Sequence, residues 1–575
     1  MLDFRNVNSL WGSVLVETLA RLGVKQAVVS PGSRSTPLTF ALARHPAIEA
    51  ISVLDERSAA FFALGLAKQY RRPVVLLCTS GTAGANYFPA VIEAQESGVP
   101  LLVITADRPP EMRDCASGQT IDQQKLFGSH VNFYHELAVP GATLPLLSYL
   151  RQTVAMAVER TLSPATGPVH LNAPFRDPLT PMEDGSTAGV TMADDFFSHL
   201  DTPTPIVSSA TIWQRPTTAR GLIVAGPATS SDPVAYAKKV LELSTALGWP
   251  VLADALSLLR GYADESSGVV SAYDAILRDA TLARDLVPRT ILCLGAWPTS
   301  KVLRAWLESA GAEILLLAPS AANRDALHGR TRQIVAPVET LAVAGERIVD
   351  SAYFDQWVHA EKEARKSLDS AMEHESGLFE GKASWLLARN LPLGTPLFVA
   401  SSMPVRDLEY FWPSNGRAKK IYFNRGANGI DGTLSTALGL AHGGVPSVVL
   451  TGDLALLHDS NGFLLRPKLR GSLTIVLINN RGGGIFEHLP IANFDPPFEE
   501  FFATPQEVDF GKLCGAHGVS HVCVRDWSHF IELTTVLPET GVRVLELLTD
   551  RKRDAAIRKA WLAAAGKAAG AGARL

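Results

Sequence analysis

Residues 447–480, which read SVVLTGDLALLHDSNGFLLRPKLRGSLTIVLINN, decide the fold of this chain. One apolar strand leads to Gly452-Asp453 and a second, over residues 473–478, leads to Asn480, with 26 residues between Asp453 and Asn480. An open parallel sheet binds ligands at the carboxyl ends of its strands, so we expect these two oxygen donors side by side. Together with a backbone carbonyl from the glycine-rich turn 481–484, they suit Mg²⁺, whose shell is completed by phosphate and water. The stretch therefore predicts a magnesium-diphosphate anchor.

Each half of this pattern also has an ordinary explanation. A Gly-Asp pair at the end of a strand is common turn chemistry, and Asn-Asn is a good start for a loop. The combination is more specific, because each pair follows its own apolar strand and the second precedes a run of glycines. We therefore favour a ligand site over two unrelated turns.

Length and composition describe a large globular enzyme. A chain of 575 residues is too long for one core and predicts three domains of roughly 150 to 200 residues. A net charge of -4 implies no bulk attraction to nucleic acid or anionic membranes. The five cysteines are scattered without a CxxC pair, and no apolar run is long enough for a membrane span or a leader peptide. We expect a cytoplasmic protein without membrane insertion.

Apolar strands alternate with amphipathic helices along the whole chain. This alternation predicts an α/β fold of three doubly wound parallel-sheet domains. The predicted parts are a first domain over residues 1–181, a linker over 182–218, a central domain over 219–350, a connector helix over 351–375 and a third domain over 376–575. The central domain lacks a GxGxxG fingerprint and is expected to act mainly as a scaffold. The Ala/Gly/Lys-rich tail after Trp561 is expected to be a fraying helix.

Two turns in the first domain carry candidate polar residues. Ser33 and Arg34 follow a strand and a glycine, where a helix N-terminus exposes N–H groups to an anion. Glu56 follows Asp55 at the end of the next strand. The alternatives are a plain turn with a surface arginine and, for the acids, a helix cap with a first-turn charge.

Several longer motifs carry a resemblance to a known family. They are SPGSRSTPLT from residue 30, TSGTAGAN from 79, TADRPPE from 105, NRGANGIDG from 424 and GGGIFEHLP from 482. With the Asp453 and Asn480 motifs, they make the whole chain resemble thiamine-diphosphate enzymes with pyrimidine-binding, central and pyrophosphate-binding domains. Within these enzymes it most resembles the 2-succinyl-5-enolpyruvyl-6-hydroxy-3-cyclohexene-1-carboxylate (SEPHCHC) synthase family, also called the MenD family. Leu454 departs from the usual motif, which has a third glycine there.

The resemblance implies a transferase of menaquinone or phylloquinone biosynthesis. It would decarboxylate 2-oxoglutarate with thiamine diphosphate and Mg²⁺ or Mn²⁺, and add the resulting carbanion to isochorismate. Glu56 would hydrogen-bond the aminopyrimidine ring, and Ile430 would support the bent cofactor. Asp453, Asn480 and the Gly482 carbonyl would bind the metal. The other cofactor-binding residues implied by the resemblance are Gly452, Ile485 and Phe486.

The resemblance also implies how two dicarboxylate substrates would be bound. Arginine suits this task because its planar guanidinium binds a carboxylate through two hydrogen bonds. Ser402, Arg406 and Arg425 would contact 2-oxoglutarate. The isochorismate set would be Ser33, Arg34, Arg108, Gln119 and Lys301. Of these residues, Glu56, Gln119, Ser402, Arg406 and Arg425 would be catalytic.

Family members build each site between two subunits, so the resemblance implies a homodimer or a homotetramer. Two other functions stay open from the sequence. One is a different thiamine-diphosphate 2-oxoacid lyase or carboligase, and the other is a silent homologue with a binding or regulatory role. The arginine set speaks against small monocarboxylate substrates, and the retention of Glu56, Asp453 and Asn480 speaks against a silent homologue.

Overall fold

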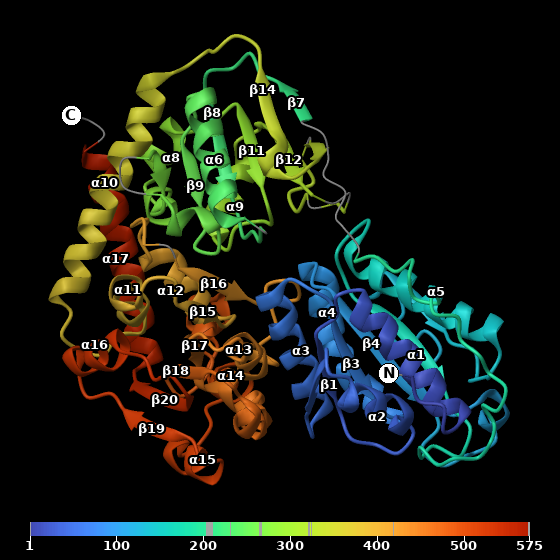
Figure 1. Cartoon of the computed structure of the whole chain (residues 1–575). Helices are drawn as coiled ribbons and strands as arrows, with labels where there is room; N and C mark the ends of the chain where they lie inside the picture. The colour runs from blue at the N-terminus through green and yellow to red at the C-terminus, as the bar shows by residue number, and fades with distance from the viewer. Residues whose placement is uncertain are drawn as a thin grey trace.

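A computed structural model describes residues 2–202, 211–230, 232–263, 267–319, 322–323, 325–329, 331–417 and 419–572. Its main feature is three six-stranded parallel sheets flanked by helices (Figure 1). The α/β prediction with three parallel sheets is thereby confirmed. The limits of the domains stay a prediction, and residues 203–210 of the predicted linker lie outside the described part.

The first sheet has the strand order β2-β1-β3-β4-β6-β5. Its strands are β1 (Gln26–Val29), β2 (Glu49–Ser52), β3 (Val74–Cys78), β4 (Leu101–Asp107), β5 (Phe133–Glu136) and β6 (Val169–Pro174). Its helices are α1 (Val7–Arg21), α2 (Thr36–Arg44), α3 (Glu56–Tyr70), α4 (Phe88–Ser97) and α5 (Leu144–Leu162), with short 3-10 turns at Gly81–Tyr87 and Pro110–Met112. Every residue of β3 and β4 is buried, as expected for central parallel strands.

The second sheet has the order β10-β9-β8-β11-β12-β13. Its strands are β8 (Gly221–Ala225), β9 (Val251–Ala253), β10 (Val269–Val270), β11 (Thr290–Leu294), β12 (Glu313–Ala318) and β13 (Thr331–Val335). Its helices are α6 (Pro233–Leu247), α7 (Tyr273–Ile276), α8 (Ala280–Asp285) and α9 (Lys301–Ser309), with 3-10 turns at Leu258–Gly261 and Val338–Thr340. A separate parallel pair joins β14 (Leu341–Ala344) to β7 (Thr211–Gln214), so part of the segment expected as a linker is a strand.

The third sheet has the order β16-β15-β17-β18-β20-β19. Its strands are β15 (Pro396–Val399), β16 (Lys420–Phe423), β17 (Ser447–Gly452), β18 (Ser472–Asn479), β19 (Ser520–Cys523) and β20 (Gly541–Leu548). The helices of this part are α11 (Glu380–Asn390), α12 (Met403–Phe411), α13 (Thr433–Ala441), α14 (Asp453–His458), α15 (Phe510–Ala516), α16 (Trp527–Thr535) and α17 (Arg551–Gly572). Shorter helical turns are Ser460–Lys468, Gly484–His488, Pro490–Asn493 and Glu499–Ala503.

The first and third sheets meet through α3 and α13, which face each other in Figure 1. A Cβ added at Gly65 would lie 2.1 Å from the carbonyl oxygen of Thr436, and one added at Gly439 would lie 2.2 Å from that of Phe62. Only glycine permits this close approach of two helix backbones. The crossing therefore fixes how the two parts of the chain pack.

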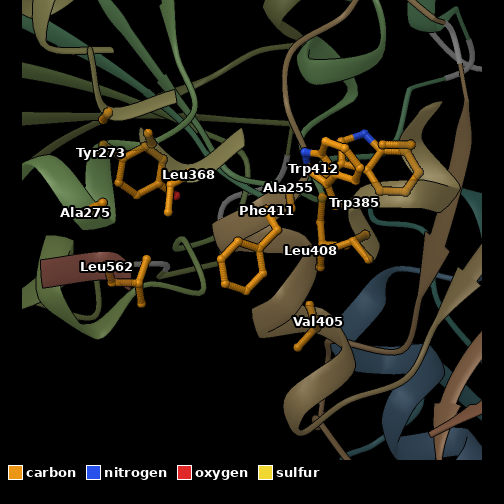
Figure 2. Close-up of a cluster of buried hydrophobic side chains, with 14 of the residues drawn as sticks. Ala255, Tyr273, Ala275, Leu368, Trp385, Val405, Leu408, Phe411, Trp412 and Leu562 are labelled. Carbon is orange, nitrogen blue, oxygen red and sulfur yellow. The ribbon is translucent and has the colours of Figure 1, made fainter. Parts of the chain in front are cut away.

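The second and third sheets share one hydrophobic core. Figure 2 shows Tyr273 of α7, Leu368 of α10 (Ser351–His374), Phe411 of α12 and Leu562 of α17 converging in it. The long helices α10 and α17 lie side by side along one edge of the molecule (Figure 1). Among the described residues, no helix combines the length and the apolar character that crossing a membrane requires.

The expectation of a fraying C-terminal helix is wrong. Helix α17 extends to Gly572, and its residues Leu562, Ala565 and Ala569 are fully or almost fully buried. A Cβ added at Gly566 would lie 2.5 Å from the carbonyl oxygen of Ala275. The Ala/Gly composition thus allows close packing against α7, a role that low-complexity composition does not reveal.

This contact yields a stability prediction for Gly566→Ala. The new methyl group meets backbone that cannot move aside freely, so we expect a loss of about 1–3 kcal/mol in the free energy of unfolding, measured by denaturant titration. Gly515→Ala in α15 is the matched control, because a Cβ there has open space within 4 Å. The control is expected to gain up to about 1 kcal/mol from helix propensity. Equal behaviour of the two variants would contradict the packing of α17.

Candidate functional site

The ends of β17 and β18 form the centre of a cavity of about 370 Å³. The two strands pair in parallel, with Gly452 opposite Ile478, so Asp453 and Asn480 follow at the same edge. Ten of the residues singled out from the sequence line this cavity: Ser402, Arg406, Arg425, Ile430, Gly452, Asp453, Asn480, Gly482, Ile485 and Phe486. Each lining residue lies between Glu380 and Phe486.

The donor atoms at the strand ends fit a hard divalent cation. Asn480 donates from Nδ2 to Glu380 Oε1 at 2.5 Å. Its Oδ1 is buried and has no hydrogen-bond partner among the residues that the structure describes. A buried polar atom without a partner costs free energy, and a metal ion would satisfy it. Across the described residues, no group of three or more His, Cys, Asp or Glu side chains could hold a metal, so phosphate and water would have to complete this coordination shell.

The glycine turn after Asn480 shapes the other side of the anchor. Gly482 has φ of +132°, and a Cβ there would lie 2.3 Å from the carbonyl oxygen of Ala503. Its N–H donates to Asp453 Oδ2 at 2.8 Å, which ties the turn to the end of β17. The Gly482 carbonyl accepts from Gly484 and retains a second lone pair for a ligand. Only glycine fits this backbone, so the turn residue is explained by geometry.

The surroundings of Asp453 shift the pKa of its carboxyl group. Burial raises the pKa of this carboxyl to about 6, although hydrogen bonds from the N–H groups of Gly482 and Leu454 act in the opposite direction. A cation beside a carboxylate favours its charged form. The side chain is thus suited to bind a metal ion in exchange for a proton.

Two guanidinium groups and a strained turn also line the cavity. Ser402 precedes α12 with φ of +72° and ψ of -129°, a rare conformation for a residue with a side chain. Arg406 donates from Nη1 to the Ser402 carbonyl at 2.6 Å. Burial lowers the pKa of Arg406 and of Arg425, and the charge of Arg406 lowers the pKa of Arg425 further. Two neighbouring cations in a half-buried wall favour an anionic ligand.

A second cluster collects candidates from the first sheet. Arg108 donates from Nη1 to Ser80 Oγ at 2.6 Å, and Gln119 donates from Nε2 to the Ser80 carbonyl at 3.0 Å. Arg34 is buried and donates to the Phe175 carbonyl, while its Nε has no partner among the described residues. Burial and the nearby charge of Arg108 lower the pKa of Arg34. The exposed Ser33 precedes Arg34 in the same turn.

Glu56 and Lys301 are the first residues of two other helices. Glu56 is the first residue of α3, and Asp55 is the helix cap, accepting from the N–H of Ser58. Glu56 is half-buried and its charge contributes to raising the pKa of Cys78 and of Tyr87. Lys301 is exposed at the first turn of α9. Neither they nor the cluster around Ser80 line the cavity formed by their own chain.

Sequence reasoning missed four polar residues of the cavity wall, which are Glu380, Ser401, Asp407 and Asn428. Asn428 has φ of +64° and lines the cavity beside Ile430. Glu380 is buried at the start of α11 and accepts from Asn480. Asn428 belongs to the motif NRGANGIDG, so the sequence contained a signal for it. Glu380 lies in the first turn of α11, where an acid usually indicates only a favourable interaction with the helix dipole.

The chain is similar to known proteins along nearly its whole length. Residues 11–126 match the profile described as thiamine pyrophosphate enzyme, N-terminal TPP binding domain, and residues 192–399 match the middle domain of thiamine pyrophosphate enzymes. The chain is 53% identical to a protein of Gloeothece citriformis (strain PCC 7424), over 96% of this chain and 97% of the relative. It is 52% identical to a protein of Nostoc sp. (strain PCC 7120), with 97% of each covered, and 50% identical to one of Trichodesmium erythraeum (strain IMS101), with 96% and 97% covered.

All three relatives carry the name 2-succinyl-5-enolpyruvyl-6-hydroxy-3-cyclohexene-1-carboxylate synthase. Identity of this level over nearly the full length of both sequences establishes common ancestry. It agrees with the thiamine diphosphate profile at the N-terminal sheet and with the cavity at the ends of β17 and β18. The chain belongs to the SEPHCHC synthase family of thiamine-diphosphate-dependent enzymes.

Proposed function

We propose that this protein decarboxylates 2-oxoglutarate and joins the resulting four-carbon unit to isochorismate, which would give the product that the name of its relatives states. The observation that carries the proposal is one cavity that is lined both by an oxygen-donor anchor and by two arginines. An anchor alone would fit any diphosphate enzyme. Arg406 and Arg425 add the positive charge that substrates with two carboxylates need.

The residues of the cavity would have different roles in binding the cofactor and the metal. Thiamine diphosphate, when bound, supplies the electron sink that decarboxylation of a 2-oxoacid requires. Asp453, Asn480 and the Gly482 carbonyl would hold Mg²⁺ or Mn²⁺ against the diphosphate. Ile430 would support the cofactor rings, and Gly452, Ile485 and Phe486 would line the space around them.

Arg406 and Arg425 form the part of the cavity that would bind the substrate. Arg406 and Arg425 would hold the distal carboxylate of 2-oxoglutarate, and Ser402 would orient it from the strained turn. Their partial burial limits contact with water, which strengthens each charge interaction. The carboxylate that leaves as carbon dioxide would then lie away from these cations, so its negative charge would not be stabilised before the bond breaks.

The proposal includes a site completed by a second copy of this chain. Glu56, Ser33, Arg34, Arg108 and Gln119 do not line the cavity of their own chain, which supports their contribution to the site of a partner. Glu56 would hold a proton at the pyrimidine ring, and the other four, with Lys301 from the central part, would bind isochorismate. A homodimer is the smallest assembly that satisfies this arrangement, and a homotetramer satisfies it as well.

The proposed reaction is tested by carbon dioxide release from 2-oxoglutarate. Purified protein with thiamine diphosphate and Mg²⁺ is expected to release carbon dioxide, to do so faster when isochorismate is added, and to form an adduct that mass analysis identifies. Turnover of pyruvate in place of 2-oxoglutarate would keep the cofactor chemistry and overturn the substrate. Failure with both would favour a silent homologue.

Arg406→Ala tests whether the arginines of the cavity bind 2-oxoglutarate. Loss of a charged hydrogen bond to the substrate costs about 1.5–3 kcal/mol, so kcat/KM for 2-oxoglutarate is expected to fall about 10- to 100-fold. Arg525→Ala, at an exposed arginine next to α16, is the matched control and is expected to leave kcat/KM unchanged. Full activity of Arg406→Ala would show that this wall does not bind the substrate.

Complementation tests the shared site. Glu56→Gln and Asp453→Ala are each expected to be inactive alone. Co-expressed subunits carrying one change each would form mixed dimers with one doubly altered site and one intact site, giving about a quarter of wild-type activity in a random mixture. A mixture as inactive as either variant would show that each chain builds its own site.

A further inference from the structure

A buried ionic network contacts the metal anchor through Glu380. Arg558 of α17 donates from Nε and Nη2 to the two oxygens of Asp407 at 2.7 and 2.9 Å, and from Nη2 to Glu380 Oε2 at 3.0 Å. The side chains of Arg558, Glu380 and Asp407 are 2–3% exposed. Replacing one partner of such a buried group leaves the others without compensation, so the network is sensitive to any single change.

Helix α17 fixes Glu380 at two points. The Asp554 carboxylate accepts from the backbone N–H of Glu380 at 3.0 Å, and Arg558, one turn later, binds the side chain of Glu380 through Oε2. This leaves Oε1 for the 2.5 Å hydrogen bond from Asn480 Nδ2. The position and rotamer of Glu380 are therefore determined by the C-terminal helix.

The carboxylate of Glu380 determines which end of the Asn480 amide faces it. An amide presents an NH₂ group on one side and an oxygen on the other, and the two ends have nearly the same shape. A carboxylate only accepts, so Glu380 pairs with the NH₂ end and repels the oxygen end. Asn480 Oδ1 is then left buried without a partner on the other side, as the structure shows for the described residues. A reversed amide would direct N–H groups at the cation.

We propose that Glu380 and Arg558 are positioning residues that turn the Asn480 oxygen toward the metal, so that the C-terminal helix determines the affinity of the anchor for Mg²⁺. The inference deepens the proposed function and rests on its metal site alone, independent of the substrates. Residues that orient a metal ligand typically contribute 10- to 100-fold to affinity. Through Glu380, α17 is linked to Asn480 of the proposed metal site, although α17 is remote in sequence from both anchor motifs.

The test measures the Mg²⁺ concentration needed for half-maximal binding of thiamine diphosphate, by calorimetry and without substrate. Glu380→Gln has the same shape but one oxygen, which cannot serve both Arg558 and Asn480. We expect its Mg²⁺ requirement to rise about 10-fold or more. Asp274→Asn is the matched control, a buried acid on α7 that accepts from Ser300, and it is expected to keep the wild-type requirement.

A double variant separates orientation from general damage. Asn480→Asp presents oxygen on both sides and needs no orientation, and the NH₂ group of Glu380→Gln can donate to it. The combination of both changes is therefore expected to restore Mg²⁺ binding toward wild type, whereas Asn480→Asp alone places two carboxylates together and binds less well than the combination. A purely structural role for Glu380 would give additive losses in this cycle.

Arg558→Lys provides an independent variant if Glu380→Gln does not fold. Lysine keeps the charge but cannot bridge Glu380 and Asp407 with a planar fork, so an intermediate Mg²⁺ requirement is expected. An unchanged requirement in the variant that keeps the wild-type melting temperature, or no rescue in the double variant, overturns the inference. Wild-type protein that binds thiamine diphosphate independently of Mg²⁺ would instead overturn the metal part of the proposed function.

Discussion

The hydrogen bond between Asp453 and the N–H of Gly482 joins the ends of two parallel strands, and the cavity depends on it. It requires β17 and β18 to run side by side in register, so that residues 29 positions apart in sequence meet. It also requires glycine at position 482, because the turn passes too close to Ala503 for a side chain. Once this link is made, Asn480 and the Gly482 carbonyl are placed beside the Asp453 carboxylate.

The positive wall of the cavity depends on a different part of the chain. Helix α12 carries Arg406 toward the cavity and Leu408 and Phe411 into the core shared with the second sheet (Figure 2). Buried Arg260 of the central part donates to the carbonyls of Glu409 and Trp412 at the end of α12. The central part therefore does more than connect two sheets, since it fixes the helix on which Arg406 stands.

The sequence was sufficient to predict that Asp453 and Asn480 lie at the same edge of one sheet. Asp453 and Asn480 follow apolar strands, and parallel pairing brings strand ends together in any doubly wound sheet. Glu380 was not predictable in this way, because its role comes from packing against Asn480, 100 residues away. The tail was misjudged because its Ala/Gly/Lys composition gives no sign that Gly566 packs against α7 and Gly570 against Asp279. Strand β7 was missed because its partner, β14, lies more than a hundred residues further along the chain.

The most direct test of the account is a crystal structure of the protein with thiamine diphosphate and Mn²⁺, with anomalous scattering used to locate the metal. The account predicts one anomalous peak bound by Asp453, by the oxygen of Asn480 and by the Gly482 carbonyl, with Asn480 Nδ2 still directed at Glu380. A metal located elsewhere, or an Asn480 side chain that turns away from it, would contradict the account.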